Sequence, residues 1–312
     1  MAVGRFAPSP TGTLHLGNLR TALVAWLFAR AGGSRFLVRM EDLDRVQSRP
    51  DHERRQLADL AELGLDWDGP VVRQSERFDR YEAAISRLDA AGLTYRCWCT
   101  RREIREAASA PHGDLPDGAY PGTCRDLPTP DVAARERSDR PPALRLRSDG
   151  PTVAFTDRLA GTVTGGVDDV VLRRNDGVPA YNLAVVVDDA DQGVEEVVRG
   201  DDLLSSTPRQ LHLARLLGLP EPTHAHVALV VAPDGERLAK RHGSVSLSDR
   251  AAQGQSPDEV RSWLAWSLGL AEPGEAVSAG RLVERFDPGH LPRKPWVLSP
   301  ADLERSGSSG SD

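Results

Sequence analysis

Cysteines, aromatic residues and long apolar runs are all scarce in this sequence of 312 residues. Three cysteines are too few to hold a chain of this size together by disulfides, which excludes the small disulfide-stapled class of secreted proteins. No apolar run approaches the ~20 residues needed to cross a bilayer, and no basic segment followed by an apolar one opens the chain. We therefore expect a cytoplasmic protein without a membrane span.

An excess of basic charge is also missing. The 39 Lys and Arg residues against 46 Asp and Glu residues give a net charge of −7. This balance argues against the broad basic surface of a non-specific nucleic-acid binder, but a local basic groove stays possible. The sequence does contain an ordinary globular mixture, with 39% hydrophobic and 27% charged residues. Its length is typical of about two domains.

The first 42 residues carry the pattern of a β-loop-α-β unit. A short strand runs into a loop rich in Pro and Gly, and apolar residues then recur at helical spacing over residues 19–30. A second predicted strand, residues 35–40, ends at Glu41. Because ligands gather at the carboxyl ends of parallel strands, His15, Gly17 and Glu41 are predicted to lie at a binding edge.

The rest of the chain alternates between helical, irregular and apolar segments. Residues 50–93 have helical periodicity, whereas residues 95–150 are rich in Pro, Gly, Arg and Asp, as in an inserted module. The apolar run at residues 180–188 fits either a buried strand or a buried helix. A helix is predicted to begin at Thr207, and the last residues, 306–312, are expected to be a disordered tail.

Two loops could bind a nucleotide. His15 and Gly17 precede a predicted helix, whose free N–H groups favour a phosphate, although a lone histidine before a helix is more often a helix cap or a surface residue. Arg237, Lys240 and Arg241 form a basic loop that could clamp a triphosphate and stabilise charge on a transferred phosphoryl group. Alternatively, this loop is a solvated turn. The presence of both loops in one chain favours the nucleotide interpretation.

In seven stretches, occurring in the family's order between residues 4 and 250, the chain resembles class I aminoacyl-tRNA synthetases of the glutamate type. One stretch matches the family's "HIGH" motif and another its "KMSKS" loop, although Arg237 replaces the first Lys of that loop and Ala239 its Ser. The matching stretches are residues 5–12, 15–18, 39–44, 180–182, 198–201, 207–210 and 237–241.

The resemblance implies an α/β fold with a Rossmann-like, doubly wound parallel sheet. This sheet would be split by an inserted, zinc-bearing, acceptor-like subdomain and followed by a small helical, stem-contact-like module that holds the basic loop. The implied ranges are 1–91 and 175–220 for the two halves of the catalytic domain, 92–174 for the insertion, 221–305 for the C-terminal module and 306–312 for the tail.

The resemblance also implies the residues of the site. Glutamate would be bound by two cations, one anion for its ammonium group and two further polar groups: Arg5, Arg199, Glu41, Ser9 and Tyr181. ATP would be bound with Mg²⁺ by His15, Gly17, Asn18 and Lys240, of which His15 and Lys240 are the expected catalytic residues. Pro8, Asn18, Arg237 and Arg241 belong to the motif loops.

Within this family the chain resembles a truncated branch, whose members attach glutamate to queuosine in tRNA(Asp). Only 312 − 243 = 69 residues follow Gly243, too few for the anticodon-binding region of the longer enzymes, and Leu203 also fits the truncated branch better. The implied partners are ATP, L-glutamate and tRNA(Asp) bearing queuosine, with the chain acting as a monomer. The alternatives are a short enzyme that charges tRNA(Glu) and a catalytically inactive tRNA-binding protein.

Three cysteines in one 28-residue segment, Cys97, Cys99 and Cys124, indicate a local metal site. A structural zinc needs four ligands, and the resemblance supplies Tyr120 as the fourth. From the chemistry of the side chains alone, His112 is the better candidate, and Asp114 is a third. Three free thiols without a metal remain the alternative to one structural Zn²⁺ per chain.

Overall fold

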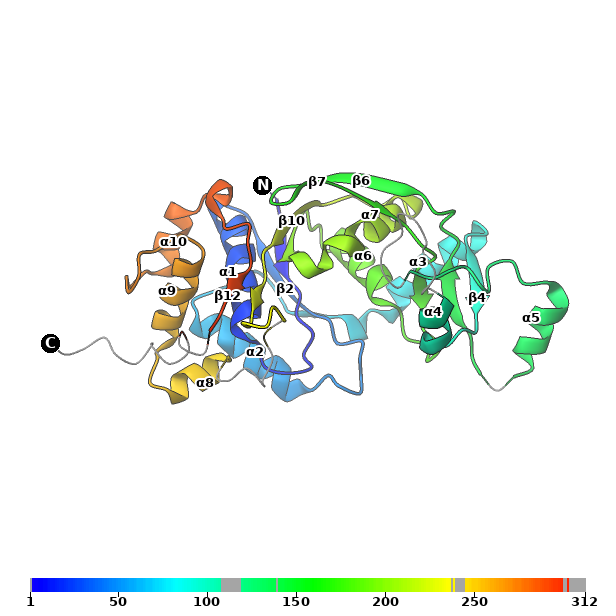
Figure 1. Cartoon of the computed structure of the whole chain (residues 1–312), viewed down its shortest axis with the longest axis horizontal. Coiled ribbons are helices and arrows are strands. Elements are labelled where there is room, and N and C mark those ends of the chain that lie inside the picture. Colours follow the sequence, from blue (N-terminus) through cyan, green and yellow to red (C-terminus); the bar gives the residue numbers. More distant parts are fainter. Residues whose placement is uncertain are drawn as a thin grey trace.

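The computed structural model describes residues 2–107, 119–138, 140–236, 238, 245–299 and 302. Figure 1 shows an elongated molecule with the C-terminal helices at one end. Strand β4 (Thr94–Cys97) and helix α5 (Thr129–Glu136) lie at the opposite end. The central sheet lies between these two ends.

Seven strands form the central sheet, and the six neighbouring strands from β3 to β6 are all parallel. The edge strand β7 pairs with β6 in the antiparallel direction. The parallel α/β fold predicted from the sequence is therefore confirmed. In spatial order, the strands are β3 (Val72–Arg73), β2 (Phe36–Met40), β1 (Gly4–Phe6), β9 (Glu196–Gly200), β10 (Thr223–Val227), β6 (Thr152–Asp157) and β7 (Gly161–Gly166).

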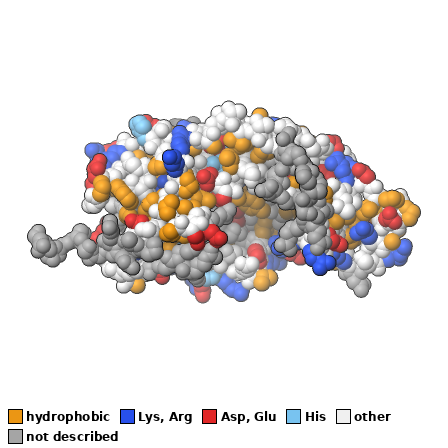
Figure 2. Space-filling view, viewed as in Figure 1, with side chains coloured by type: hydrophobic (Ala, Val, Ile, Leu, Met, Phe, Trp, Pro, Cys, Tyr) orange, Lys and Arg blue, Asp and Glu red, His pale blue; other side chains and the backbone are white. Residues whose placement is uncertain are grey.

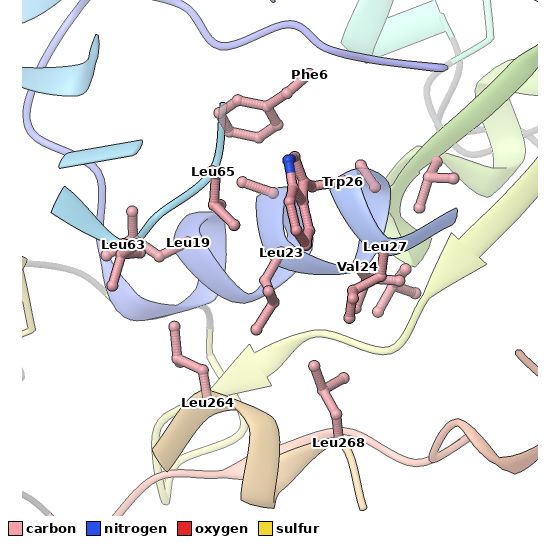
Figure 3. Close-up of a cluster of buried hydrophobic side chains, with 14 of the residues drawn as sticks. Phe6, Leu19, Leu23, Val24, Trp26, Leu27, Leu63, Leu65, Leu264 and Leu268 are labelled. Atoms are coloured by element: carbon pink, nitrogen blue, oxygen red, sulfur yellow. The ribbon is translucent and has the colours of Figure 1, made fainter. Parts of the chain in front are cut away.

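Helix α1 (Leu16–Ala31) is the centre of the main hydrophobic core. It connects β1 to β2, as the sequence predicts, and it is apolar on almost every side because both of its faces are covered. Figure 3 shows Phe6 and Leu65 above the helix and Leu264 and Leu268 below it. The sheet and the C-terminal helices therefore pack against the same helix, which fixes the position of its N-terminus.

Further helices lie along the chain on either side of the segment that carries the cysteines. The apolar run at residues 180–188, which fits strand or helix in the sequence, is the buried helix α6. It packs against α3 and α7 in a second hydrophobic cluster. The helices and 3-10 turns of this part are α2 (Pro50–Glu62), η1 (Gln74–Glu76), α3 (Phe78–Ala90), α6 (Tyr181–Asp191), η2 (Asp201–Ser206) and α7 (Thr207–Leu216).

A separate antiparallel sheet of β4, β5 (Ala143–Leu146) and β8 (Val171–Arg173) carries the segment with the cysteines. Helix α4 (Arg101–Ala107) follows β4. Strands β6 and β7 fall within the range 92–174 expected for the insertion, yet they pair with the central sheet. The central sheet therefore extends beyond the ranges 1–91 and 175–220, because residues 152–166 return to its far edge.

The C-terminal part begins with strand β10, which lies between β9 and β6 in the central sheet. The remaining elements pack against α1 or pair with each other. They are β11 (Val230–Val231), α8 (Leu247–Ala252), α9 (Pro257–Ser267), α10 (Ala279–Arg285), η4 (Pro288–His290) and β12 (Trp296–Val297). The tail 306–312 lies outside the described residues. Within the part of the chain that the structure describes, no helix is both long and apolar enough to cross a membrane.

Candidate active site

A cavity of about 620 Å³ opens where β1, β2 and β9 end and α1 begins. Figure 2 shows that the molecule is hollowed near its middle. Ligands of open α/β sheets bind at this edge, next to the carboxyl ends of the strands. The structure brings together here all the described residues that were predicted for glutamate and ATP: Arg5, Pro8, Ser9, His15, Gly17, Asn18, Glu41, Tyr181 and Arg199.

The loop between β1 and α1 is held in place by contacts from two other elements. The backbone N–H of Glu41 donates to the carbonyl of Pro8 over 2.9 Å. The buried amide of Gln56 on α2 donates to the carbonyls of Ser9 and Gly12, over 3.0 and 2.7 Å. Gln56 was not predicted from the sequence, because its contact with the loop spans more than forty residues.

His15 is the N-cap of α1, so the cap interpretation is correct as far as local structure goes. Its Nδ1 accepts the backbone N–H of Asn18 over 3.2 Å, and the Asn18 side chain accepts the backbone N–H of His15 over 3.2 Å. A neutral imidazole whose Nδ1 accepts must carry its proton on Nε2. The cap therefore fixes the ring so that it presents an Nε2–H donor at the N-terminus of the helix.

Gly17 makes room for this imidazole. A Cβ at this position would lie 3.0 Å from both Cε1 and Nδ1 of His15 and 3.4 Å from the Cβ of Val230. The first two separations are tighter than ordinary van der Waals contact, so a side chain here would require the ring to shift. The structure shows that Gly17 lets the histidine approach. Gly17 also lines the cavity, and its role in letting a ligand approach stays a prediction.

The predicted catalytic Lys240, together with Arg237 and Arg241, lies outside the described residues. Its flanks are described. Leu238 is buried in the main core, and the carbonyl of Val245 accepts the backbone N–H of Leu16 over 2.7 Å. Both flanks are therefore attached to the core around α1, and Val245 contacts the first residue of that helix directly.

Arg5 and Glu41 are connected through two buried residues, Asp189 and Arg39. Arg5 donates from Nε and Nη2 to the two carboxylate oxygens of Asp189, over 3.1 and 3.3 Å. Arg39 donates from Nη1 to Asp189 over 2.8 Å and from Nη2 to Glu41 over 3.3 Å. Neither Asp189 nor Arg39 is among the candidate site residues predicted from the sequence, although both contact the predicted residues and orient them.

The two carboxylates in this network differ in their pKa values. Burial would raise the pKa of Asp189, but the guanidinium groups of Arg5 and Arg39 outweigh it and hold that pKa below its usual value. At Glu41 burial dominates over Arg39 and Arg5, and the pKa is raised. The positive charges of Arg39 and Arg5 thus do not fully offset the burial of the Glu41 carboxyl group. A cation bound beside it in the cavity would favour its charged form.

Arg199 projects from β9 into the same cavity and is itself buried. Its Nε donates to Nε2 of His226 over 3.1 Å. Nη1 donates to Gln210 over 2.8 Å and to the phenol oxygen of Tyr181 over 3.4 Å. Nη2 donates to Thr207 over 2.9 Å and to the carbonyl of Leu203 over 3.3 Å. Its two longest bonds, to Tyr181 and to Leu203, involve residues that also line the cavity.

A second cavity, of about 570 Å³, shares Ser9, Glu41 and Tyr181 with the first. It extends toward the small sheet and the cysteines. Cationic side chains contribute much of its lining: Arg101, Arg140, Arg145 and Arg174. The two cavities meet at the residues predicted to surround glutamate, so an anionic partner in the second cavity could reach the first.

The sulfur atoms of Cys97, Cys99 and Cys124 lie within 4.8 Å of one another. The phenol oxygen of Tyr120 is 3.3 Å from the Cys97 sulfur and 3.6 Å from the Cys99 sulfur, and it accepts the backbone N–H of Cys124 over 2.8 Å. The Cys99 and Cys124 sulfurs are 3.5 Å apart. His112 and Asp114, the other candidate ligands, lie outside the described residues.

These separations fit a tetrahedral zinc site. With Zn–S bonds of about 2.3 Å and a Zn–O bond of about 2.0 Å, neighbouring ligands would be about 3.8 Å apart for two sulfurs and about 3.5 Å for sulfur and oxygen. The separations of 3.3, 3.6 and 3.5 Å lie close to these values, and all three sulfurs lie within 4.8 Å of one another.

Comparison with known proteins identifies the family. A family model described as "tRNA synthetases class I (E and Q), catalytic domain" matches residues 1–299. The chain belongs to this family. As a class I synthetase it is a ligase, and the candidate cavity lies within the matched catalytic domain.

Relatives of this synthetase have specific names. The chain is 63% identical to "Glutamyl-Q tRNA(Asp) synthetase" of Nocardia farcinica, over 95% of this chain and 93% of the relative. It is 49% identical to the protein of the same name from Symbiobacterium thermophilum, over the whole of both chains. The structure resembles a glutamate tRNA ligase from Elizabethkingia meningosepticum, crystallised with its amino acid, with a TM-score of 0.80 and 28% identity over 98% of this chain and 68% of the ligase.

Proposed function

We propose that this synthetase activates L-glutamate with ATP and transfers it to queuosine in tRNA(Asp). The observation that carries the first step is the charge pattern around one cavity: the cations Arg5 and Arg199 and the carboxylate Glu41. Glutamate has two carboxylates and one ammonium group, and this set is its complement. Buried arginine is well suited to bind carboxylates because its planar fork donates two parallel hydrogen bonds.

The amino acid would enter beside Tyr181. Its side-chain carboxylate would take over the donors of Arg199 that now form the long bonds to Tyr181 and to Leu203, at 3.4 and 3.3 Å. Its ammonium group would lie against Glu41, where it would supply the positive charge that this buried carboxyl group lacks. Glutamine has no second charge for Arg199, so the same site would select against it.

The first chemical step would be attack of the α-carboxylate oxygen on the α-phosphorus of ATP. One P–O bond forms to glutamate, the bond to the β-phosphate breaks, and pyrophosphate leaves. No protein base is needed because the nucleophile is already an anion. His15 would donate from Nε2 to a phosphate oxygen at the N-terminus of α1, and Lys240 would neutralise charge on the transferred group. Mg²⁺ bound with ATP supplies further charge neutralisation.

In the second step a hydroxyl of queuosine would attack the carbonyl carbon of the adenylate, and AMP would leave. The names of the relatives at 63% and 49% identity support queuosine of tRNA(Asp) as the acceptor. The second cavity supports an RNA partner, because its arginines would bind phosphates next to the residues proposed to bind the substrate glutamate.

We further propose that Cys97, Cys99, Cys124 and Tyr120 hold one structural zinc. All four ligand positions would be filled by the protein, so no site for an activated water remains. The metal would connect β4 to the segment around residue 120. On this proposal the small sheet is an acceptor-like insertion that shapes the second cavity, and the C-terminal helices form a stem-contact-like module of a monomer.

A transfer assay tests the acceptor. Purified protein, ATP, Mg²⁺ and labelled glutamate would be incubated with queuosine-containing tRNA(Asp), with tRNA(Asp) that lacks queuosine, and with tRNA(Glu). The proposal predicts label on the first tRNA only. Label on tRNA(Glu) would favour a short enzyme that charges that tRNA, and tRNA binding without labelling would indicate an inactive descendant of a synthetase.

A further inference from the structure

A buried chain of three side chains lies behind the glutamate cavity. His226 is on β10, between Arg199 on β9 and Asp157 on β6, and both His226 and Asp157 have completely buried side chains. The Nδ1 of His226 lies 2.6 Å from a carboxylate oxygen of Asp157. Its Nε2 lies 3.1 Å from Nε of Arg199. The three residues come from adjacent parallel strands, so the sheet itself sets their spacing.

The donors in this chain can be assigned by elimination. One oxygen of Asp157 accepts the backbone N–H groups of Leu159, Ala160 and His226, over 2.9, 2.8 and 3.2 Å. Burial alone would raise the pKa of Asp157, but these bonds and the one from the His226 ring lower it to about 2. An ionised Asp157 requires a proton on Nδ1 of His226. Arginine can only donate, so Nε2 of His226 must be the acceptor.

We propose that Asp157 and His226 are positioning residues that aim Arg199 into the glutamate cavity. The inference rests on the proposed function, in which Arg199 binds the side-chain carboxylate of glutamate. Asp157 fixes the tautomer of the imidazole, and the imidazole holds Nε of Arg199. The Nη groups of the guanidinium then face the cavity, Gln210 and Thr207.

The arrangement works only while His226 is neutral. Protonation would place a second N–H against the Arg199 Nε–H, so a hydrogen bond would be replaced by repulsion between two cations. The charged and titratable groups around the ring are Asp157 on β6, Arg199 on β9, Asp201 on η2 and His224 on β10. Burial and the cation of Arg199 lower the pKa of His226 more than the two carboxylates raise it.

This geometry predicts a pH effect with a definite sign. Near pH 7 the ring is neutral and Arg199 is held in position. As the pH falls through the depressed pKa of His226, the ring gains a proton and the KM for glutamate rises. Between about pH 5 and 8 the charges of glutamate itself do not change, because an ordinary side-chain carboxyl titrates near 4.3.

The main test compares variants by glutamate-dependent ATP–pyrophosphate exchange. His226→Leu removes the acceptor for Arg199, and the loss of a hydrogen bond to a charged group predicts a rise of about tenfold or more in the KM for glutamate. Asp157→Asn should give a similar rise, because the amide no longer enforces the Nδ1–H tautomer. In both variants the KM for ATP should change less than about twofold.

Two further variants separate positioning from general stability. His226→Gln keeps an acceptor oxygen near the place of Nε2, so it should restore much of the affinity and abolish the contribution of residue 226 to the pH profile. His224→Phe is the matched control: His224 is buried on the same strand and stacks on His226, with ring centroids 5.9 Å apart. It should lower the melting temperature without raising the KM for glutamate.

A nitrogen NMR spectrum of the wild type tests the geometry without any substrate. The inference predicts that His226 is the neutral Nδ1–H tautomer at pH 7, and an Nε2–H tautomer or a charged ring would overturn it. Unchanged KM values for glutamate in Asp157→Asn and His226→Leu would also overturn it. If the wild type shows no exchange with glutamate, the proposed function fails, and the spectrum still decides whether Asp157 and His226 hold Arg199.

Discussion

Asp189→Asn removes a buried negative charge from between two arginines. The carboxylate accepts two bonds from Arg5 and one from Arg39, and its side chain is only 9% exposed. Breaking a buried ion pair by removing one partner costs about 3–5 kcal/mol. At about 2–4 °C per kcal/mol, the melting temperature should fall by on the order of 10 °C. Because Arg5 also loses its support, the KM for glutamate should rise at least about tenfold.

The neighbouring Asp188 provides a matched control. It is completely buried on the same helix, and its hydrogen bonds come from Tyr81, Gln74 and Arg77, over 2.8, 2.9 and 2.7 Å. Its ion pair with Arg39 is long, at 3.7 Å, and within the described residues it has no hydrogen bond from Arg5. Asp188→Asn should therefore lower the melting temperature by a similar amount and leave the KM for glutamate almost unchanged. The assays are thermal unfolding by circular dichroism and pyrophosphate exchange at varied glutamate. Equal effects of both substitutions on that KM would refute the reasoning, since Asp189 would then act only through stability.

A comparison of the wild type with Asp189→Asn over a range of pH tests the electrostatic contribution of Asp189. Because the pKa of Asp189 is held below its usual value, its ion pairs stabilise the fold above the ordinary carboxyl pKa of about 4. This stabilisation is lost as the pH falls through the depressed native value. The difference in melting temperature between the wild type and Asp189→Asn should thus be largest near neutral pH and shrink in acid. A difference that grows in acid would contradict the assignment.

Five further substitutions test three other parts of the site. Lys240→Ala should slow adenylate formation by roughly 10²-fold, as loss of a charge-stabilising donor commonly does. Arg241→Ala should slow it less. Equal, small effects of the two substitutions would mean that the basic loop is only a surface turn. Tyr120→Phe should weaken zinc binding, measured by metal analysis after competition with a chelator, and His112→Ala should not; the reverse result would make the histidine the fourth ligand. Gly17→Ala, whose Cβ would lie 3.0 Å from the imidazole of His15, should lower the exchange rate at saturating glutamate by about tenfold. An unchanged rate would show that the position of this ring does not affect catalysis.

Local patterns in the sequence predict the first part of the fold well. The β1-α1-β2 unit follows from apolar spacing and from the Gly residues after the helix, and the structure confirms it. The run at residues 180–188 is ambiguous because a helix buried on all sides has no polar face to reveal its period. The return of β6 and β7 to the central sheet is not visible locally, because β6 pairs with β10, about seventy positions away in the sequence, and β7 joins the sheet only through β6.

The candidate site, too, could be predicted from the sequence only in part. Arg5, Glu41 and Arg199 were assigned through the resemblance to a family, and the structure brings all three to one cavity. The residues that orient them were not predicted: Asp189 on α6 and His226 on β10. Their roles depend on hydrogen bonds between strands and helices far apart in the sequence, which no spacing rule describes.

The central claim is that this cavity activates glutamate, and pyrophosphate exchange without any tRNA tests it most directly. Hydrogen bonds to other side chains of the same chain hold Arg5, Glu41 and Arg199 around the cavity. The account predicts exchange that depends on glutamate and is at least about a hundredfold weaker with glutamine, which lacks the second carboxylate. Comparable exchange with glutamine, or exchange with glutamate only after tRNA is added, would contradict it.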